Sequence, residues 1–166
     1  MKSFFLFAVT LVAMSMTGCQ TPARTAETRE QEVTVVHVGA FSAALGTELR
    51  LAEVWIGGRN TGFNRNALAA EGFADGFTLE FDTERITGTA APNRYFAPYT
   101  LGQGNAVSIG AVAQTQMIAL FEPEQLREDD YLFFIQNVYR WDFVGGNLEL
   151  SSRDRGGQGV RLVFQR

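Results

Sequence analysis

Residues 77–99 read FTLEFDTERITGTAAPNRYFAPY, and this stretch decides the fold. Apolar and polar residues alternate over positions 77–82, which is the period-two pattern of a strand with one buried face. The polar segment 82–85 predicts a tight turn, and residues 86–88 resume an extended chain. We expect residues 90–95 to leave the sheet, and the rest of the chain to complete it.

Short strands are expected on both sides of this stretch. Alternating or β-branched residues predict them at 32–38, 48–56, 105–109, 141–144, 148–150 and 160–164. The Gly-Gly-Asn segment at 145–147 predicts a hairpin turn, and residues 151–159 form a polar, glycine-rich loop in this interpretation. A short helical turn is expected at 67–71, whereas the pattern leaves the conformation of 113–120 open.

One principal helix is predicted in the second half of the chain. It should begin near Pro123, because proline suits the first helical position, and end at residue 139 or 140. Its first half is acidic, which suits the positive end of the helix dipole. Its apolar face would comprise Leu126, Phe133, Phe134 and Val138. Strands around one late helix predict an α+β fold with a mainly antiparallel sheet that is strongly curved or partly barrel-like.

Composition limits the function. A chain of 166 residues suits one folded domain and little more. The formal net charge is −4 and there is no basic stripe, so a nucleic-acid partner is not expected. Cys19 is the only cysteine, which excludes an intramolecular disulfide and any cysteine-based metal site.

The amino terminus has the layout of a secretory signal peptide. Lys2 precedes an apolar run at 4–14, and small residues follow. The run is shorter than the roughly 20 residues that a membrane-spanning helix needs. The ending Met16-Thr17-Gly18-Cys19 resembles a bacterial lipobox, whereas the alternative is an ordinary signal peptide with a chance cysteine.

The lipobox resemblance implies an address in the cell envelope. It implies cleavage before Cys19, lipidation of the Cys19 thiol, and acylation of the new amino group by a chain such as palmitate. Gln20 replaces the aspartate of inner-membrane retention, which implies an outer-membrane anchor facing the periplasm. We therefore expect a signal peptide at 1–18, a flexible tether at 19–32 and a single domain at 33–166.

Few residues point to catalysis. His37 is the only histidine, and no G-x-S-x-G motif accompanies it, so a catalytic triad is not supported. Glu80 and Asp82 share one strand face and could form a carboxylate pair, but the alternation favours a solvated face. Residues 128–130 are acidic but lack the ligand spacing of a calcium loop, which indicates a solvated helix face.

Two polar segments leave alternatives open. Asn93 is interpreted as a structural turn residue, because asparagine tolerates unusual backbone angles and bonds to nearby backbone groups. In the alternative interpretation, Asn93, Arg94, Tyr95 and Tyr99 form an interaction motif. The Arg153-Asp154-Arg155 segment would meet either phosphate or water.

Several motifs in residues 46–166 carry a family resemblance. They are Phe81-Asp82, the segment GTAAPNRY at 88–95, Tyr99, Ser108-Ile109-Gly110 with Thr115 and Met117, Tyr131-Leu132, Leu148 with Leu150, and Leu162-Val163-Phe164. This pattern resembles the META domain of the HslJ-like heat-shock lipoproteins. The chain departs from the family at Pro92 and Ala119, where cysteines are common, and at Ala91, where glycine is common.

The resemblance implies a role in the envelope, such as stress or drug tolerance, and no known reaction. We expect a non-catalytic lipoprotein that maintains the envelope or its stress tolerance through protein or surface interactions, with the membrane and an envelope protein as partners. No cofactor or metal is expected. The alternatives are a small-ligand or inhibitor-like binding module in the periplasm, and an enzyme whose site has no recognised motif.

Overall fold

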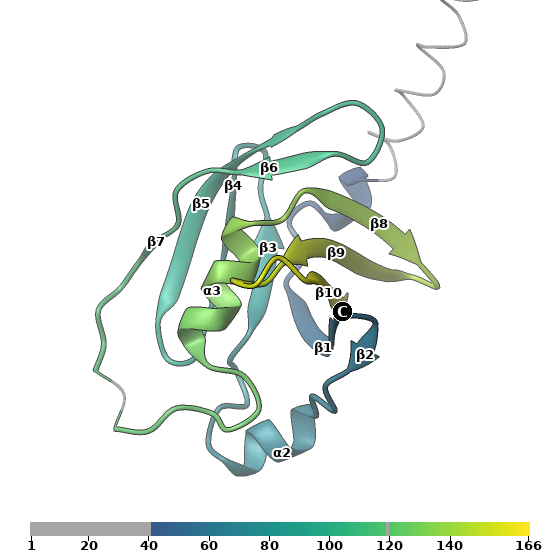
Figure 1. Cartoon of the computed structure of the whole chain (residues 1–166). Coiled ribbons are helices and arrows are strands. Elements are labelled where there is room, and N and C mark those ends of the chain that lie inside the picture. Colours follow the sequence, from purple (N-terminus) through teal and green to yellow (C-terminus); the bar gives the residue numbers. More distant parts are fainter. Residues whose placement is uncertain (1–40, 119) are drawn as a thin grey trace, which may run out of the picture.

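Antiparallel strands curve into a nearly closed, barrel-like sheet in the computed structural model, which describes residues 41–118 and 120–166 (Figure 1). The elements are η1 (Ser42–Ala44), β1 (Leu49–Ile56), β2 (Arg59–Asn60), α2 (Arg65–Ala70), β3 (Thr78–Phe81), β4 (Arg85–Thr89), β5 (Arg94–Leu101), β6 (Val107–Ile109), β7 (Ala113–Gln114), α3 (Glu128–Gln136), β8 (Arg140–Val144), β9 (Asn147–Arg153) and β10 (Gly159–Gln165). This confirms the predicted α+β class with a curved, mainly antiparallel sheet. The predicted strand at 32–38, His37, Cys19 and the tether lie outside the described residues.

The strand order divides the barrel into two half-sheets. The order is β6-β5-β4-β3-β1-β10-β9-β8, with β2 paired to β1 and β7 paired to β5. The first and last strands of this part of the chain lie side by side, from the pair Arg50↔Gln165 to the pair Ile56↔Val160. The half-sheets meet at the short β1–β3 pairing and at a single bridge, Ala106↔Arg140, between the ends of β6 and β8.

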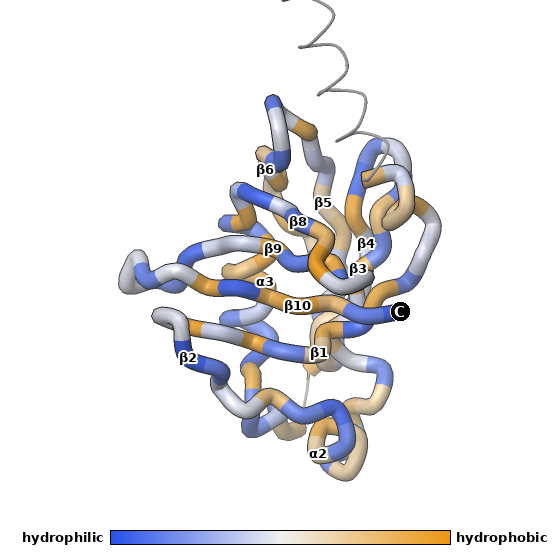
Figure 2. The backbone as a smooth tube through the Cα atoms, turned by 90° about the vertical axis from the view of Figure 1, so that its right-hand side faces the viewer, coloured by the Kyte–Doolittle hydropathy of each residue, from blue (hydrophilic) through white to orange (hydrophobic). Residues whose placement is uncertain are grey.

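The interior is filled by the inward faces of the strands. Hydrophobic residues dominate β10 (Figure 2), and its inward residues Val160, Leu162 and Phe164 are buried as predicted. Val163, on the opposite face, is buried as well. Phe41 packs edge-on against both Phe81 and Trp141, so it joins the two half-sheets from within. Side chains therefore occupy the space that a larger barrel would leave open.

Helix α3 lies between the two half-sheets (Figure 1). Its buried residues are Tyr131, Leu132, Phe134 and Ile135. The predicted start near Pro123 is wrong, because the helix begins at Glu128 and ends at Gln136. Pro123 is buried in the preceding segment, where it does not open a helix. No helix among the described residues is long and apolar enough to cross a membrane.

Two further expectations are corrected. Residues 90–95 do not leave the sheet: the chain reverses after Thr89, with the Ala90 amide donating to the Asn93 carbonyl at 2.7 Å, and Arg94 opens β5. The loop expected at 151–159 is shorter, because β9 continues to Arg153. Ser152 faces the core and donates to the Phe134 carbonyl at 2.6 Å, so a polar residue occupies an inward position that sequence alternation would assign to an apolar one.

Candidate functional site

Asn93 lies at a junction of three segments. Its side chain is 4% exposed, at the reversal between β4 and β5. Its amide nitrogen Nδ2 donates to Glu128 Oε2 at 2.8 Å and to the Met117 carbonyl at 3.3 Å. Its oxygen Oδ1 accepts from Thr115 Oγ1 at 2.8 Å and from the Met117 amide at 2.7 Å. We call these four residues the Asn93 junction.

The Asn93 junction uses the polar groups of the asparagine for internal bonds. The backbone amide of Asn93 also donates to Glu128 Oε1 at 2.8 Å, so one carboxylate holds both the side chain and the main chain. A structural role for Asn93 is consistent with this geometry and stays a prediction until the residue is replaced. The expectation that Glu128 belongs to a simply solvated face is wrong, because its carboxylate is engaged by the junction.

Tyr95 and Tyr99 face inward, whereas Arg94 is exposed. The Tyr95 hydroxyl donates to the Thr78 carbonyl at 2.9 Å and lies 3.0 Å from the Tyr131 hydroxyl. Burial raises the pKa of both Tyr95 and Tyr131 above the ordinary tyrosine value. The four residues of the proposed interaction motif therefore do not share one accessible surface.

Asp82, one of the acidic candidates, forms hydrogen bonds within a turn. Asp82 accepts the backbone amides of Glu84 and Arg85 at 2.7 and 2.9 Å, and these bonds lower the pKa of its carboxyl group. The alternation over positions 77–82 predicts that Thr78 shares the solvated face of Glu80, but Thr78 is buried and its hydroxyl accepts the Thr89 amide. The described residues contain no group of three His, Cys, Asp or Glu side chains arranged to hold a metal ion.

A second polar surface lies on the outside of β1, β8, β9 and β10. We call it the outer aromatic face, and it comprises Trp55, Tyr139, Ser151, Arg153, Gly159 and Arg161. These residues alternate with the buried positions of the same strands, so the fold that packs the core also exposes this face.

Two arginines lie over aromatic rings on this face. The guanidinium carbon of Arg161 lies 4.5 Å from the centre of the Trp55 ring, and that of Arg153 lies 5.4 Å from the centre of the Tyr139 ring. Trp55 is also held by its indole nitrogen, which donates to Glu53 at 2.7 Å. The two aromatic side chains are thus restrained, while 47% of Tyr139 stays exposed.

A hollow of about 270 Å³ opens between the aromatic side chains. It is lined by Trp55, Gly58, Tyr139, Ser151, Gly159, Val160 and Arg161. We call Ser151, Gly159 and Val160, which lie on the adjacent strands β9 and β10, its floor. Gly159 is the outward residue at this point of β10, and a Cβ added there would meet no atom within 4 Å. The absence of a side chain at position 159 therefore keeps the hollow open.

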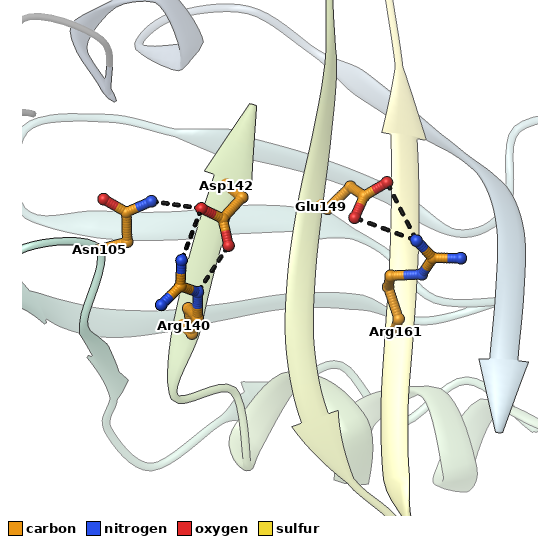
Figure 3. A network of polar contacts seen from close by, with 5 residues as sticks. All are labelled: Asn105, Arg140, Asp142, Glu149 and Arg161. Atoms are coloured by element: carbon orange, nitrogen blue, oxygen red, sulfur yellow. Dashed lines mark hydrogen bonds and ion pairs between the residues drawn. The ribbon is translucent and has the colours of Figure 1, made fainter. Parts of the chain in front are cut away.

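A row of charged residues continues from the hollow across β10, β9 and β8 (Figure 3). Arg161 Nη1 lies 3.3 Å from Glu149 Oε2, and Arg140 Nε donates to Asp142 Oδ2 at 2.6 Å. Asn105 donates to the same Asp142 carboxylate from the segment before β6. The two arginines are 40% and 54% exposed, whereas Glu149 and Asp142 are only 18% and 30% exposed, so the guanidinium groups are the more accessible part of this row.

The sequence interpretation did not identify the outer aromatic face. The sequence pattern places Arg153 in a polar loop, where it would meet phosphate or water, whereas the structure places it at the end of β9 over the Tyr139 ring. The pattern does not single out Trp55, Tyr139 or Arg161 as binding residues. A usable signal exists in β10, where the predicted inward residues 160, 162 and 164 place Gly159 and Arg161 outward. The cross-strand neighbours of Arg161, which are Trp55 and Ser151, depend on register and do not follow from the sequence of one strand.

The strand order and the central helix define a small barrel-like α+β domain. The sequence pattern of the META domain matches residues 50–166, which is more than half of the chain. The chain therefore belongs to the META domain family, which confirms the resemblance seen in its motifs.

Comparison with solved structures supports the fold. One of the matches is the NMR structure of a protein from Burkholderia xenovorans, with a TM-score of 0.53 and 18% sequence identity. The superposition covers 76% of this chain and 87% of that chain. At this identity the likeness supports the fold alone. No curated protein matches the chain.

Proposed function

We propose that this META domain protein is a non-catalytic, lipid-anchored protein of the bacterial envelope, and that it recognises an envelope component through the outer aromatic face. The observation that carries the proposal is the hollow between Trp55 and Tyr139, with arginines lying over both rings. Tryptophan, tyrosine and arginine are the residues that most often dominate recognition surfaces. Its role in the cell would be envelope maintenance or stress tolerance.

The polar groups at the centre of the domain support a structural rather than a catalytic use. The Asn93 junction and the Tyr95–Tyr131 pair direct their donors and acceptors to backbone groups and to one another. Such groups stabilise a turn and a helix contact, whereas a catalytic group must reach a substrate. We therefore place the activity of the protein on its surface.

A periplasmic module that holds a small ligand inside the sheet is the alternative function. Large side chains such as Phe41, Phe81 and Trp141 occupy the interior between the two half-sheets. The hollow on the outside therefore favours recognition at the surface over enclosure within the barrel.

The anchor is tested by mass spectrometry of the membrane fraction of cells that produce the full chain. We expect a mature amino-terminal peptide that begins at Cys19 and carries acyl groups on the thiol and the amino group. The Cys19→Ala variant should lose the modification and leave the membrane fraction. An unmodified mature chain that begins elsewhere would reject the anchor.

Recognition is tested by chemical cross-linking in intact envelopes. The full chain should cross-link to a defined component, and Trp55→Ala should reduce that product. Phe96→Ala is the matched control, because Phe96 is a 52% exposed aromatic residue of β5 that does not line the hollow. Equal cross-linking by both variants would exclude the outer aromatic face as the contact.

A further inference from the structure

We propose that the hollow on the outer aromatic face binds one carboxylate-bearing sugar ring of a saccharide chain. This inference rests on the recognition role proposed above and gives its ligand a chemical class. The row of charged residues beside the hollow would contact the hydroxyl groups of the neighbouring sugar. The argument depends on the size of the hollow, its walls, its place in the sheet and its charge.

The size of the hollow suits one ring. Sites that enclose a whole drug-sized molecule measure about 300–1,000 Å³. The volume here is about 270 Å³, and the hollow is open to solvent rather than enclosed. An occupant of one ring that continues on either side as a chain fits this shape better than an enclosed cofactor does.

The place of the hollow in the sheet favours recognition by side chains. Its floor lies on β9 and β10, and both strands already pair with neighbours on their two sides. An extended peptide that adds a strand needs a free sheet edge, and no edge is available at this point. The ligand must therefore be recognised by the side chains of Trp55, Tyr139, Ser151, Arg153 and Arg161.

The walls suit a sugar. A pyranose ring presents C–H bonds on its faces and hydroxyl groups at its rim, so its faces pack on aromatic rings while the rim bonds to polar groups. Trp55 and Tyr139 supply the apolar surface, and Ser151 supplies a hydroxyl group on the floor. Gly159 gives the ring room to approach the backbone, since nothing occupies the space where its Cβ would be.

The charge pattern favours a single carboxylate. Arg161 lines the hollow and shares its charge with Glu149. Arg153 lies over the Tyr139 ring next to the lining residues, and within residues 41–118 and 120–166 no carboxylate lies within ion-pair distance of it. Arginine binds carboxylates with two parallel hydrogen bonds. Glu149 and Asp142, which belong to the row of charged residues that begins at Arg161, would repel a continuous polyanion such as a nucleic acid (Figure 3).

The test is a binding titration of the purified full-length chain in detergent, read by calorimetry. The probes are the disaccharide of N-acetylglucosamine and N-acetylmuramic acid, trigalacturonate, and neutral chitobiose. We expect at least one of the two carboxylated probes to bind about tenfold more tightly than chitobiose. Binding of the first probe alone indicates a cell-wall source, and binding of trigalacturonate alone indicates a uronate polymer.

Two variants locate the binding. Gly159→Val fills the hollow without a clash and should weaken binding of the acidic probe by about tenfold or more. Arg153→Gln should remove most of the preference for the acidic probe over chitobiose, whereas Arg94→Gln, an exposed arginine on β5, should not. Thermal melting of each variant checks that the domain is still folded.

The inference is overturned if neither acidic probe binds more tightly than chitobiose, or if a folded Gly159→Val chain binds like the parent. These outcomes are distinct from failure of the proposed function. If Trp55→Ala loses the cross-linked partner while no saccharide binds, the proposed recognition by the outer aromatic face is supported and its ligand belongs to another chemical class. If the acidic saccharides bind but Cys19 is not acylated, the proposed ligand class is supported and the proposed membrane anchor is rejected.

Discussion

Asn93 connects the β4–β5 reversal to the start of α3 and to the segment after β7. Replacing it with alanine would leave Glu128 Oε2 and the Met117 amide without their Asn93 side-chain partners, whereas the backbone amide of residue 93 would still donate to Glu128 Oε1. Unmade hydrogen bonds of buried groups cost about 1–3 kcal/mol, so we expect Asn93→Ala to lower the free energy of unfolding by that amount. Calorimetry of the full chain measures it.

Glu80→Ala is the control for this prediction, because Glu80 is half-buried on β3 and its side chain makes no hydrogen bond within residues 41–118 and 120–166. It should change the melting temperature little. If Asn93→Ala melts like the parent but loses the cross-linked partner, the residue serves recognition and the structural interpretation fails.

The Tyr95–Tyr131 pair should make the domain sensitive to alkali. Burial raises the pKa of both phenols in the folded state, whereas in the unfolded chain they ionise near pH 10. The unfolded state therefore loses protons first, and the free energy of unfolding should decline as the pH rises above about 10. Tyr131→Phe should make this decline shallower in urea titrations at a series of pH values.

Tyr139→Phe controls for the loss of a phenol, because Tyr139 is 47% exposed in the folded domain. If Tyr139→Phe made the decline shallower by as much as Tyr131→Phe does, the buried pair would not be its cause. A decline that Tyr131→Phe does not change would show that other groups cause it.

The sequence identifies some of the residues in these contacts but not the residues that they contact. Turn chemistry picks out Asn93, because a polar residue follows Pro92 at the end of an extended run. Its partner Glu128 lies 35 residues further on, and only the packing of α3 against the sheet brings the two together. The same holds for Trp55, whose neighbour Arg161 comes from the last strand.

Strands β3 and β4 approach so closely that Gly88 has no room for a side chain. A Cβ added there would lie 2.1 Å from the Thr78 carbonyl oxygen and 2.8 Å from the Tyr95 ring. We expect Gly88→Ala to lower the free energy of unfolding by about 1–3 kcal/mol or more, because backbone and a buried ring must both shift. Gly159→Ala, whose Cβ meets nothing within 4 Å, should stay within about 0.5 kcal/mol of the parent in the same denaturant titration.

Elements with a clean alternation are predictable from the sequence, and those that depend on contacts are not. The hairpin of β8 and β9 follows from its two central glycines, whose φ values of 59° and 87° match the turn that such hairpins favour. The start of α3 is misplaced because Pro123 carries a strong local signal, whereas the helix begins where Glu128 meets the Asn93 junction.

The two half-sheets of the barrel meet along two contacts of different length, which we call seams. On one side, β1 pairs with β3 only at Leu49↔Leu79 and Arg50↔Thr78. On the other side, the Val107 amide donates to the Tyr139 carbonyl and the Trp141 amide to the Asn105 carbonyl around the Ala106↔Arg140 bridge. By contrast, β10 is paired along its length with both β1 and β9.

This difference predicts where the barrel opens first. Local opening is easiest where few backbone bonds and few buried contacts must be broken together. We therefore expect the Val107 and Trp141 amides to exchange with deuterium sooner than the amides of Val160 and Leu162, which lie in β10 and are paired on both sides with β1 and β9. Exchange followed by NMR on the full chain measures the four rates.

The Asn105–Asp142 hydrogen bond spans this second seam, so removing it tests whether the seam opens separately from the rest of the barrel (Figure 3). Asn105→Ala should speed exchange at Val107 and Trp141 and leave Leu162 nearly unchanged, whereas Arg161→Gln, which acts on the neighbouring pair of strands, should not affect the seam. If all four amides instead exchange at one common rate, and Asn105→Ala changes them together, the barrel opens only as a single cooperative unit. In that case the two half-sheets are not separable, because the shared packing of Phe41, Trp141 and α3 outweighs the weakness of the seam.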